Sequence, residues 1–126
     1  MKKKVLIIED NKKNRLLEKD LLEVAGFEVL EAEDGVTGIA LAGKEKPDAI
    51  VMDFRLPDMR GTEVARSLRQ DVETRNIPII FVTASMVGPS NVEIQSITNT
   101  FFLAKPIDTR SFAKTIHQSI SGDLHE

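Results

Sequence analysis

Short apolar runs alternate with amphipathic segments along the whole chain, and this alternation restricts the fold more than any other feature. The runs at 5–8, 49–52, 78–82 and 101–104 are short and end at polar residues, whereas 28–32 alternates between apolar and polar residues; both patterns are typical of strands. Between and after them, residues 12–25, 35–44, 61–71, 88–97 and about 108–120 predict helices. The fourth of these helices is weak, because Gly88 and Pro89 open it and few strong helix formers follow.

Apolar residues that recur at about 100° per residue predict which face of each helix packs against the sheet. In the first helix this face comprises Leu17, Leu21, Val24 and Ala25. In the second it comprises Val36, Ile39 and Ala40, in the third Val64 and Leu68, and in the last Phe112, Ile116 and Ile120. Asn11 is a suitable N-cap for the first helix, and Gly26 is a suitable stop.

Strands that alternate with helices favour right-handed βαβ units, with helices on both faces of one parallel sheet. We therefore predict an α/β fold: a three-layer αβα sandwich with a five-stranded, doubly wound parallel sheet of the flavodoxin-like (βα)5 kind. The length of 126 residues predicts a single domain over 1–126, with a core at about 4–120 and a polar tail at 121–126.

Composition excludes several classes of protein. The chain lacks cysteine, so disulfide frameworks, cysteine–zinc sites and thiol chemistry are excluded. A net charge of −3 argues against nucleic-acid binding through a basic surface. No apolar run reaches the roughly 18 residues that a membrane span needs, and the apolar run after the first lysines is too short for a signal peptide. We expect a cytoplasmic protein without membrane or nucleic-acid partners.

Polar side chains follow four of the five predicted strands. They are Glu9 and Asp10 after the first strand, Asp53 after the third, Thr83 (followed by Ala84) after the fourth, and Lys105 (followed by Pro106) after the fifth. In open parallel sheets, ligands bind at the carboxyl ends of the strands where the strand order switches. These side chains would therefore meet at one edge if the sheet order brings their strands together.

Three carboxylates at one edge repel one another by about 4 kcal/mol per pair at ~4 Å and an effective dielectric constant near 20. One lysine cannot offset them, so either a pKa rises or a cation binds. Oxygen ligands favour a hard ion, Mg²⁺ or Mn²⁺. A carboxylate beside such an ion, a lysine and a hydroxyl is suited to phosphoryl transfer, with the carboxylate oxygen as the attacking group.

Across nearly its whole length the chain resembles the receiver domain of two-component response regulators, the CheY-like superfamily, and in particular stand-alone regulators of the DivK type. The resemblance rests on the residues at the strand ends, taken in order and at the family's spacing. They are Glu9-Asp10, Asp53, Thr83-Ala84 and Lys105-Pro106-Ile107, together with Ile8, Asn11 and Asn14.

The resemblance implies a role for each residue at this edge. Asp53 would be the phosphoacceptor. Asp10 and Asp53 would bind Mg²⁺ directly, Glu9 would act through a water molecule, and the backbone carbonyl of Arg55 would complete the protein ligands. Lys105, positioned by a cis bond to Pro106, and Ala84 would contact the phosphoryl group. Thr83 and Phe102 would form the switch that reports phosphorylation to the surface of the fourth helix, fifth strand and fifth helix.

The resemblance also implies partners. A histidine kinase or histidine phosphotransfer protein would donate the phosphoryl group, and the chain would act as a monomer or weak dimer. The output would be contact with another protein or onward transfer of phosphate, because no effector follows the last predicted helix. The chain is predicted not to be an enzyme beyond intrinsic autodephosphorylation.

Two alternatives and three departures stand beside this interpretation. A pseudo-receiver would bind proteins without phosphorylation, whereas a dehalogenase-like phosphatase would need an acid where Arg55 stands. Arg55 itself lies beside the path of an attacking water. Arg60 occupies a position where an acid or amide is more usual, and Thr98-Asn99-Thr100 replaces a small Gly-Ala pair.

Overall fold

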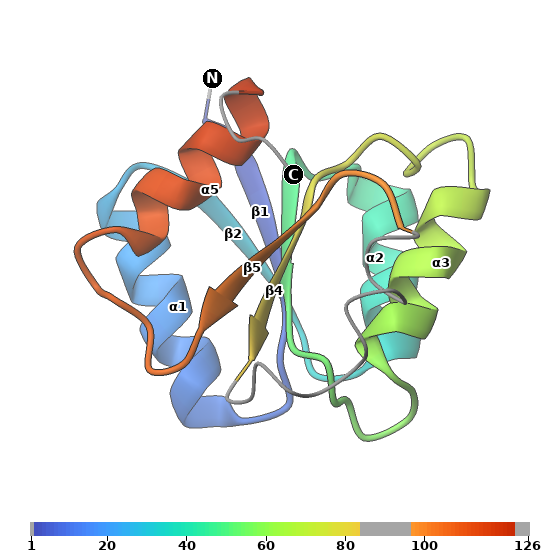
Figure 1. Cartoon of the computed structure of the whole chain (residues 1–126), viewed down its shortest axis with the longest axis horizontal. Coiled ribbons are helices and arrows are strands. Elements are labelled where there is room, and N and C mark those ends of the chain that lie inside the picture. The colour runs from blue at the N-terminus through green and yellow to red at the C-terminus, as the bar shows by residue number, and fades with distance from the viewer. Residues whose placement is uncertain (1, 84–96, 123–126) are drawn as a thin grey trace.

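The computed structural model describes residues 2–83 and 97–122 (Figure 1). Within them the element order is β1 (Lys4–Ile8), α1 (Lys12–Val24), β2 (Glu28–Ala32), α2 (Gly35–Glu45), β3 (Ala49–Met52), α3 (Gly61–Gln70), β4 (Ile79–Thr83), β5 (Thr100–Ala104) and α5 (Phe112–Ser121). Most of the predicted fourth helix lies outside the described residues.

All five strands form one parallel sheet in the order β2-β1-β3-β4-β5. Figure 1 shows α1 and α5 on one face of this sheet and α2 and α3 on the other. The predicted flavodoxin-like α/β architecture is therefore confirmed. Among the described helices, none is both long enough and apolar enough to span a membrane.

The sheet separates two apolar cores. Side chains that alternate along each strand point to opposite faces, so Leu6 and Ile8 of β1 pack towards α2 and α3, and Val5 and Ile7 pack towards α1 and α5. The central strands β1, β3 and β4 are buried at almost every position. The core therefore holds their carboxyl ends in fixed positions, and the residues that directly follow the strands are positioned as well.

The predicted inner face of α1 is only partly correct, because Leu21 packs against the core but Leu17 and Val24 are exposed. Leu17 is 43% exposed and Val24 is 90% exposed, whereas α1 buries Arg15, Glu18 and Leu22. A hydrophobic pattern assumes that polar residues avoid the sheet, but Arg15 finds three acceptors there. A charged side chain whose partners come from other elements can therefore set the rotation of a helix.

The inner face of α2 also differs in part from the prediction. Ile39 packs against the core as predicted, but Ala40 is exposed and the fully buried positions are two glycines and a different alanine. Gly35, Gly38 and Ala42 are buried, whereas Val36 is 67% exposed. A Cβ atom on Gly38 would lie 2.4 Å from Cδ1 of Ile8. The helix therefore approaches β1 more closely than a row of larger residues would permit. In α3 and α5 the predicted Val64, Leu68, Phe112 and Ile116 are buried as expected.

The unusual Thr98-Asn99-Thr100 segment is explained by α3. Asn99 has a left-handed backbone (φ 57°), which asparagine tolerates better than most residues. The guanidinium of Arg69 donates to the carbonyl oxygens of Thr98 (2.9 Å) and Asn99 (3.1 Å). The end of α3 therefore fixes the turn that leads into β5, in place of the small residues that were expected there.

Candidate functional site

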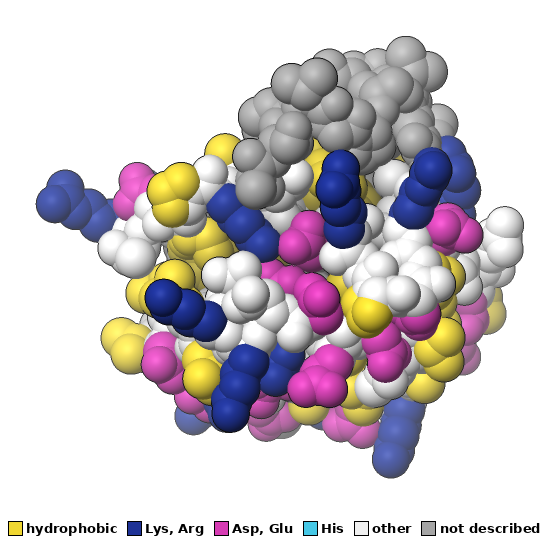
Figure 2. Space-filling model, turned by 90° about the horizontal axis from the view of Figure 1, so that it is seen from below, with side chains coloured by type: hydrophobic (Ala, Val, Ile, Leu, Met, Phe, Trp, Pro, Cys, Tyr) yellow, Lys and Arg dark blue, Asp and Glu magenta, His cyan; other side chains and the backbone are white. Residues whose placement is uncertain are grey.

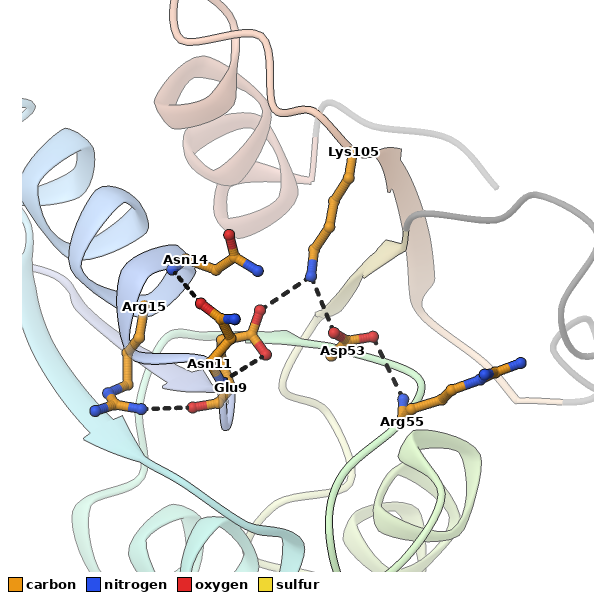
Figure 3. A network of polar contacts seen from close by, with 7 residues as sticks. All are labelled: Glu9, Asn11, Asn14, Arg15, Asp53, Arg55 and Lys105. Atoms are coloured by element: carbon orange, nitrogen blue, oxygen red, sulfur yellow. Dashed lines mark hydrogen bonds and ion pairs between the residues drawn. The ribbon is translucent and has the colours of Figure 1, made fainter.

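The carboxyl ends of β1, β3 and β5 bring together a cation and two carboxylates (Figure 3). The ammonium of Lys105 donates to Oε1 of Glu9 and to Oδ2 of Asp53, each at 3.0 Å. Glu9 and Lys105 are 96 residues apart in sequence. They meet because β1 and β3 are neighbours in the sheet, and because the long lysine side chain spans the distance from β5 across β4.

The charged side chains of this group differ in how deeply they are buried, and burial shifts the pKa of Glu9 and of Lys105. The Glu9 side chain is 2% exposed, whereas those of Lys105 and Asp53 are 18% and 20% exposed. Burial raises the pKa of Glu9 above its usual range, and the hydrogen bond and charge of Lys105 offset this only in part. Burial alone would lower the pKa of Lys105, but its hydrogen bonds to Asp53 and Glu9 raise it overall. Two carboxylates share this one ammonium, so the group is net negative whenever both are ionised.

Asp53 is held by its backbone and remains accessible through its side chain. Its N–H donates to the carbonyl of Ile8 (3.3 Å), and its Oδ1 accepts from the N–H of Arg55 (3.3 Å). A Cβ atom on Gly61 would lie 2.5 Å from the carbonyl oxygen of Asp53. Glycine is therefore required at position 61, so that the start of α3 can lie against the end of β3.

The other predicted site residues lie around this group. Asp10 is exposed and makes no hydrogen bond or ion pair within the described part of the chain. Thr83 is buried at the end of β4, and its carbonyl oxygen accepts from the N–H of Lys105 at 2.7 Å. The side chain of Arg55 is exposed and points away from Glu9 and Lys105 in Figure 3. The peptide bond between Lys105 and Pro106 is cis, as the resemblance implied. Ala84 lies outside the described residues.

Phe102 belongs to a cluster of three phenylalanines next to Asp53. The ring of Phe54, which follows Asp53, stacks on Phe81 of β4 with centroids 4.7 Å apart. Phe102 of β5 lies 5.7 Å from Phe54 and 6.0 Å from Phe81, and it is 36% exposed. The predicted switch residue therefore sits half-buried against the neighbour of the predicted phosphoacceptor.

The donor set at this edge fits a hard divalent cation, although the carboxylates are not gathered around one point. Within the described residues, no three acidic or histidine side chains converge in a metal-binding arrangement. Instead, the Lys105 ammonium lies between the carboxylates of Glu9 and Asp53. Oxygen ligands with excess negative charge are what Mg²⁺ prefers in proteins, so the chemistry of the set fits the ion.

Figure 2 shows the same end of the molecule as a surface. Acidic side chains gather in the middle of this face, and lysine and arginine side chains lie around them. A cation can approach the centre, and an anionic group can contact the surrounding positive charges. Both features suit phosphoryl transfer, in which a metal ion and positively charged side chains stabilise the negative phosphoryl oxygens.

Two residues that support this edge were not predicted. Arg15 donates to the carbonyl oxygen of Glu9. Asp58 accepts from the N–H groups of Gly35 (2.8 Å) and Val36 (2.9 Å), and these hydrogen bonds lower its pKa. Asp58 thereby attaches the loop that follows Asp53 to the start of α2. An acid beside a helix N-terminus is a recognisable signal, but only the structure shows that the helix belongs to another part of the chain.

Comparison with known proteins identifies the family. Residues 5–117 match the model of the response regulator receiver domain. The chain is 38% identical over 123 residues to the polar-differentiation response regulator DivK of Brucella anthropi and to that of Brucella ovis, covering 98% of this chain and 99% of each relative. The chain belongs to the response regulator receiver family, whose general role is phosphorylation-dependent signalling.

Solved structures agree with this assignment. The chemotaxis response regulator CheY4 of Vibrio cholerae has a TM-score of 0.87 at 28% identity, covering 94% of this chain and 99% of that chain. The receiver domain of a sensor histidine kinase from Pseudomonas aeruginosa also has a TM-score of 0.87, at 27% identity, covering 96% and 99%. That receiver domain was crystallised with a magnesium ion coordinated in its active site cleft.

Proposed function

We propose that Asp53 accepts a phosphoryl group from a phosphohistidine on a histidine kinase or histidine phosphotransfer protein. The observation that carries this proposal is the pairing of Lys105 with both Glu9 and Asp53 at the carboxyl ends of three parallel strands. A carboxylate oxygen of Asp53 attacks phosphorus and forms the O–P bond. The N–P bond breaks, its electron pair returns to the histidine nitrogen, and that nitrogen takes up a proton.

Other residues at this edge would hold the divalent cation and contact the phosphoryl group. Glu9, Asp10, Asp53 and the backbone carbonyl of Arg55 would hold Mg²⁺ or Mn²⁺, with Glu9 acting through a water molecule. When bound, the ion supplies positive charge that neutralises the phosphoryl oxygens. Lys105, which already contacts Asp53, would turn to a phosphoryl oxygen, and Ala84 would contribute a backbone contact. Two carboxylates that share one ammonium support such a cation site.

Phosphorylation would be reported through Thr83 and Phe102. Thr83 is buried at the end of β4, and its side chain would turn towards the phosphoryl group on Asp53. Phe102, which lies next to Phe54 and Phe81, would then turn inward into the space that Thr83 vacates. We propose that a single domain over residues 1–126, monomeric or weakly dimeric, signals by contact with another protein or by onward transfer of the phosphoryl group.

The deciding experiment is intact-mass measurement after incubation with Mg²⁺ and acetyl phosphate. We expect the wild type to gain one phosphoryl group, and to gain none with a chelator present. Asp53→Asn should gain none, because an amide oxygen is too weak a nucleophile. Asp20→Asn, an exposed acid on α1, is the matched control and should behave as the wild type. Phosphorylation of Asp53→Asn would refute Asp53 as the phosphoacceptor, and an unmodified wild type would refute the proposal in favour of a pseudo-receiver.

Arg55 is proposed to slow the loss of this phosphoryl group by water. Its exposed cationic side chain begins two residues after Asp53 and would turn towards the phosphoryl group to contact an oxygen there. Exposed charge pairs contribute about 0.5–1 kcal/mol, so Arg55→Ala should shorten the phosphoryl half-life about two- to fivefold. The half-life is measured by intact mass after acetyl phosphate is removed. The exposed Arg75 supplies the control, and equal half-lives for Arg55→Ala and the wild type would exclude this role.

A further inference from the structure

Two cations hold Glu9 at different points of the residue. Its side chain accepts from Lys105, whereas its backbone carbonyl oxygen accepts from Nη1 of Arg15 at 2.9 Å, in a buried hydrogen bond. Its N–H donates to the carbonyl of Ala32 at 3.0 Å. Figure 3 shows Arg15 and Lys105 on opposite sides of Glu9. Glu9, the first residue of the Glu9-Asp10 pair, is therefore held both through its side chain and through its backbone.

Arg15 is itself fixed by acceptors that belong to other elements. Its Nε lies 3.3 Å from Oε1 of Glu31 in β2, and its Nη2 lies 3.2 Å from Oε1 of Glu33, just after β2. Its side chain is 10% exposed. A guanidinium offers its N–H donors in a rigid plane, so these contacts set the direction in which Nη1 points. The two carboxylates also balance its charge, so Arg15 opposes a nearby divalent cation only weakly.

The bond from Arg15 reaches the peptide group that joins Glu9 to Asp10. Because a peptide group is planar, fixing the carbonyl of Glu9 also fixes the direction of the Asp10 N–H and the starting point of the Asp10 side chain. When Lys105 turns to a phosphoryl group, Glu9 loses its side-chain partner but keeps the contact with Arg15. This step rests on the function proposed above.

We propose that Arg15 is a positioning residue that orients Glu9 and Asp10 for the divalent cation through the peptide group between them. Residues that orient metal ligands typically change metal affinity 10- to 100-fold when they are replaced. Arg15→Gln should therefore weaken Mg²⁺ binding by about 10- to 100-fold. Arg15→Lys, which keeps the charge but has one ammonium in place of the planar fork, should also weaken it, by a smaller factor.

The measurement is titration calorimetry of each folded protein with Mg²⁺, and with Mn²⁺ as a second probe, without any phosphodonor. Unfolding midpoints in a chelator are recorded for the same variants. A residue that only stabilised the fold would lower the midpoint and leave the Kd of the folded protein unchanged. Lys19→Gln is the matched control, because Lys19 pairs with Glu31 at 3.5 Å and has no bond to Glu9. It should bind as the wild type does.

The outcomes separate this inference from the proposed function. If the Asp10→Asn and Asp53→Asn variants bind Mg²⁺ with the same affinity as the wild type, the proposed cation site is overturned. Normal wild-type binding with unchanged or tighter binding in both Arg15 variants would overturn only the positioning role. If Arg15→Gln does not fold, then Arg15→Lys and the double variant Glu31→Gln/Glu33→Gln decide. Both should bind more weakly, and unchanged affinity in both contradicts the inference.

Discussion

Replacing Lys105 with methionine should destabilise the metal-free protein by about 3 kcal/mol at pH 7, because breaking a buried ion pair leaves a charge without compensation. Lys105 is the cation that contacts both Glu9 and Asp53, and the Glu9 side chain is 2% exposed. Without the ammonium, the pKa of Glu9, which burial already raises, would rise further. The variant should also fail to gain the phosphoryl group, because the positive charge beside Asp53 would be lost.

This loss should depend on pH and on metal. As the pH falls through the raised pKa of Glu9, this carboxylate takes up a proton and the ammonium matters less, so the difference between Lys105→Met and the wild type should shrink. Saturating Mg²⁺ should shrink it as well. The difference in unfolding free energy is measured by urea unfolding under three conditions. These are a chelator at pH 7, Mg²⁺ at pH 7 and a chelator at pH 4.5. Lys114→Met, at an exposed position on α5, should leave stability nearly unchanged. A pH-independent difference would contradict the ion-pair explanation.

Glu18→Gln should abolish a loss of stability that the wild type shows as the pH rises. Glu18 is 2% exposed on the inner face of α1. Burial, together with the charges of Glu9 and Asp53, raises its pKa from 4.5 to about 8. The folded state therefore holds a proton that the unfolded chain releases near pH 4.5. Stability is full below that pH and falls as the pH rises through 8, by up to about 5 kcal/mol.

Glutamine has nearly the same shape and does not ionise, so the variant should be more stable than the wild type at pH 9 and similar to it at pH 4. Urea unfolding from pH 4 to pH 9, in a chelator, gives both curves. Glu23→Gln, at an exposed position on the same helix, should follow the wild-type curve. Parallel curves for Glu18→Gln and the wild type would show that Glu18 does not hold a proton in the folded state.

The strands could be predicted because their signal is local. β2 and β3 have the predicted bounds, and β1 and β5 each begin one residue earlier than predicted. A strand buried on both faces must be apolar along its length, so its end coincides with the first charged residue. The same rule located Glu9 and Asp53 at the edge of the sheet. The roles of the residues there came from the family resemblance.

The faces of α1 and α2 could not be predicted in this way. Leu17 and Val24 gave α1 an apolar stripe, yet the helix turns Arg15 and Glu18 inwards. The acceptors for Arg15 come from the residue after β1, from β2 and from the residue after β2. A pattern within one helix carries no information about charges that other elements supply. Gly35 and Gly38 of α2 illustrate the same limit, because only the close approach of Gly38 to Ile8 and of Gly35 to Met59 explains why they face inwards.

Taken alone, the sequence determined which segments are buried on folding and the spacing of their apolar residues. These two features predicted a parallel α/β sheet with an acidic edge. Hydrophobic burial depends on residue type and spacing, both of which are written in the chain. The tertiary structure decided which charges meet there: Lys105 with Glu9 and Asp53, Arg15 with the Glu9 carbonyl, and Asp58 with the start of α2. Such pairings depend on directions and distances between elements far apart in the chain, and these exist only once the sheet has formed.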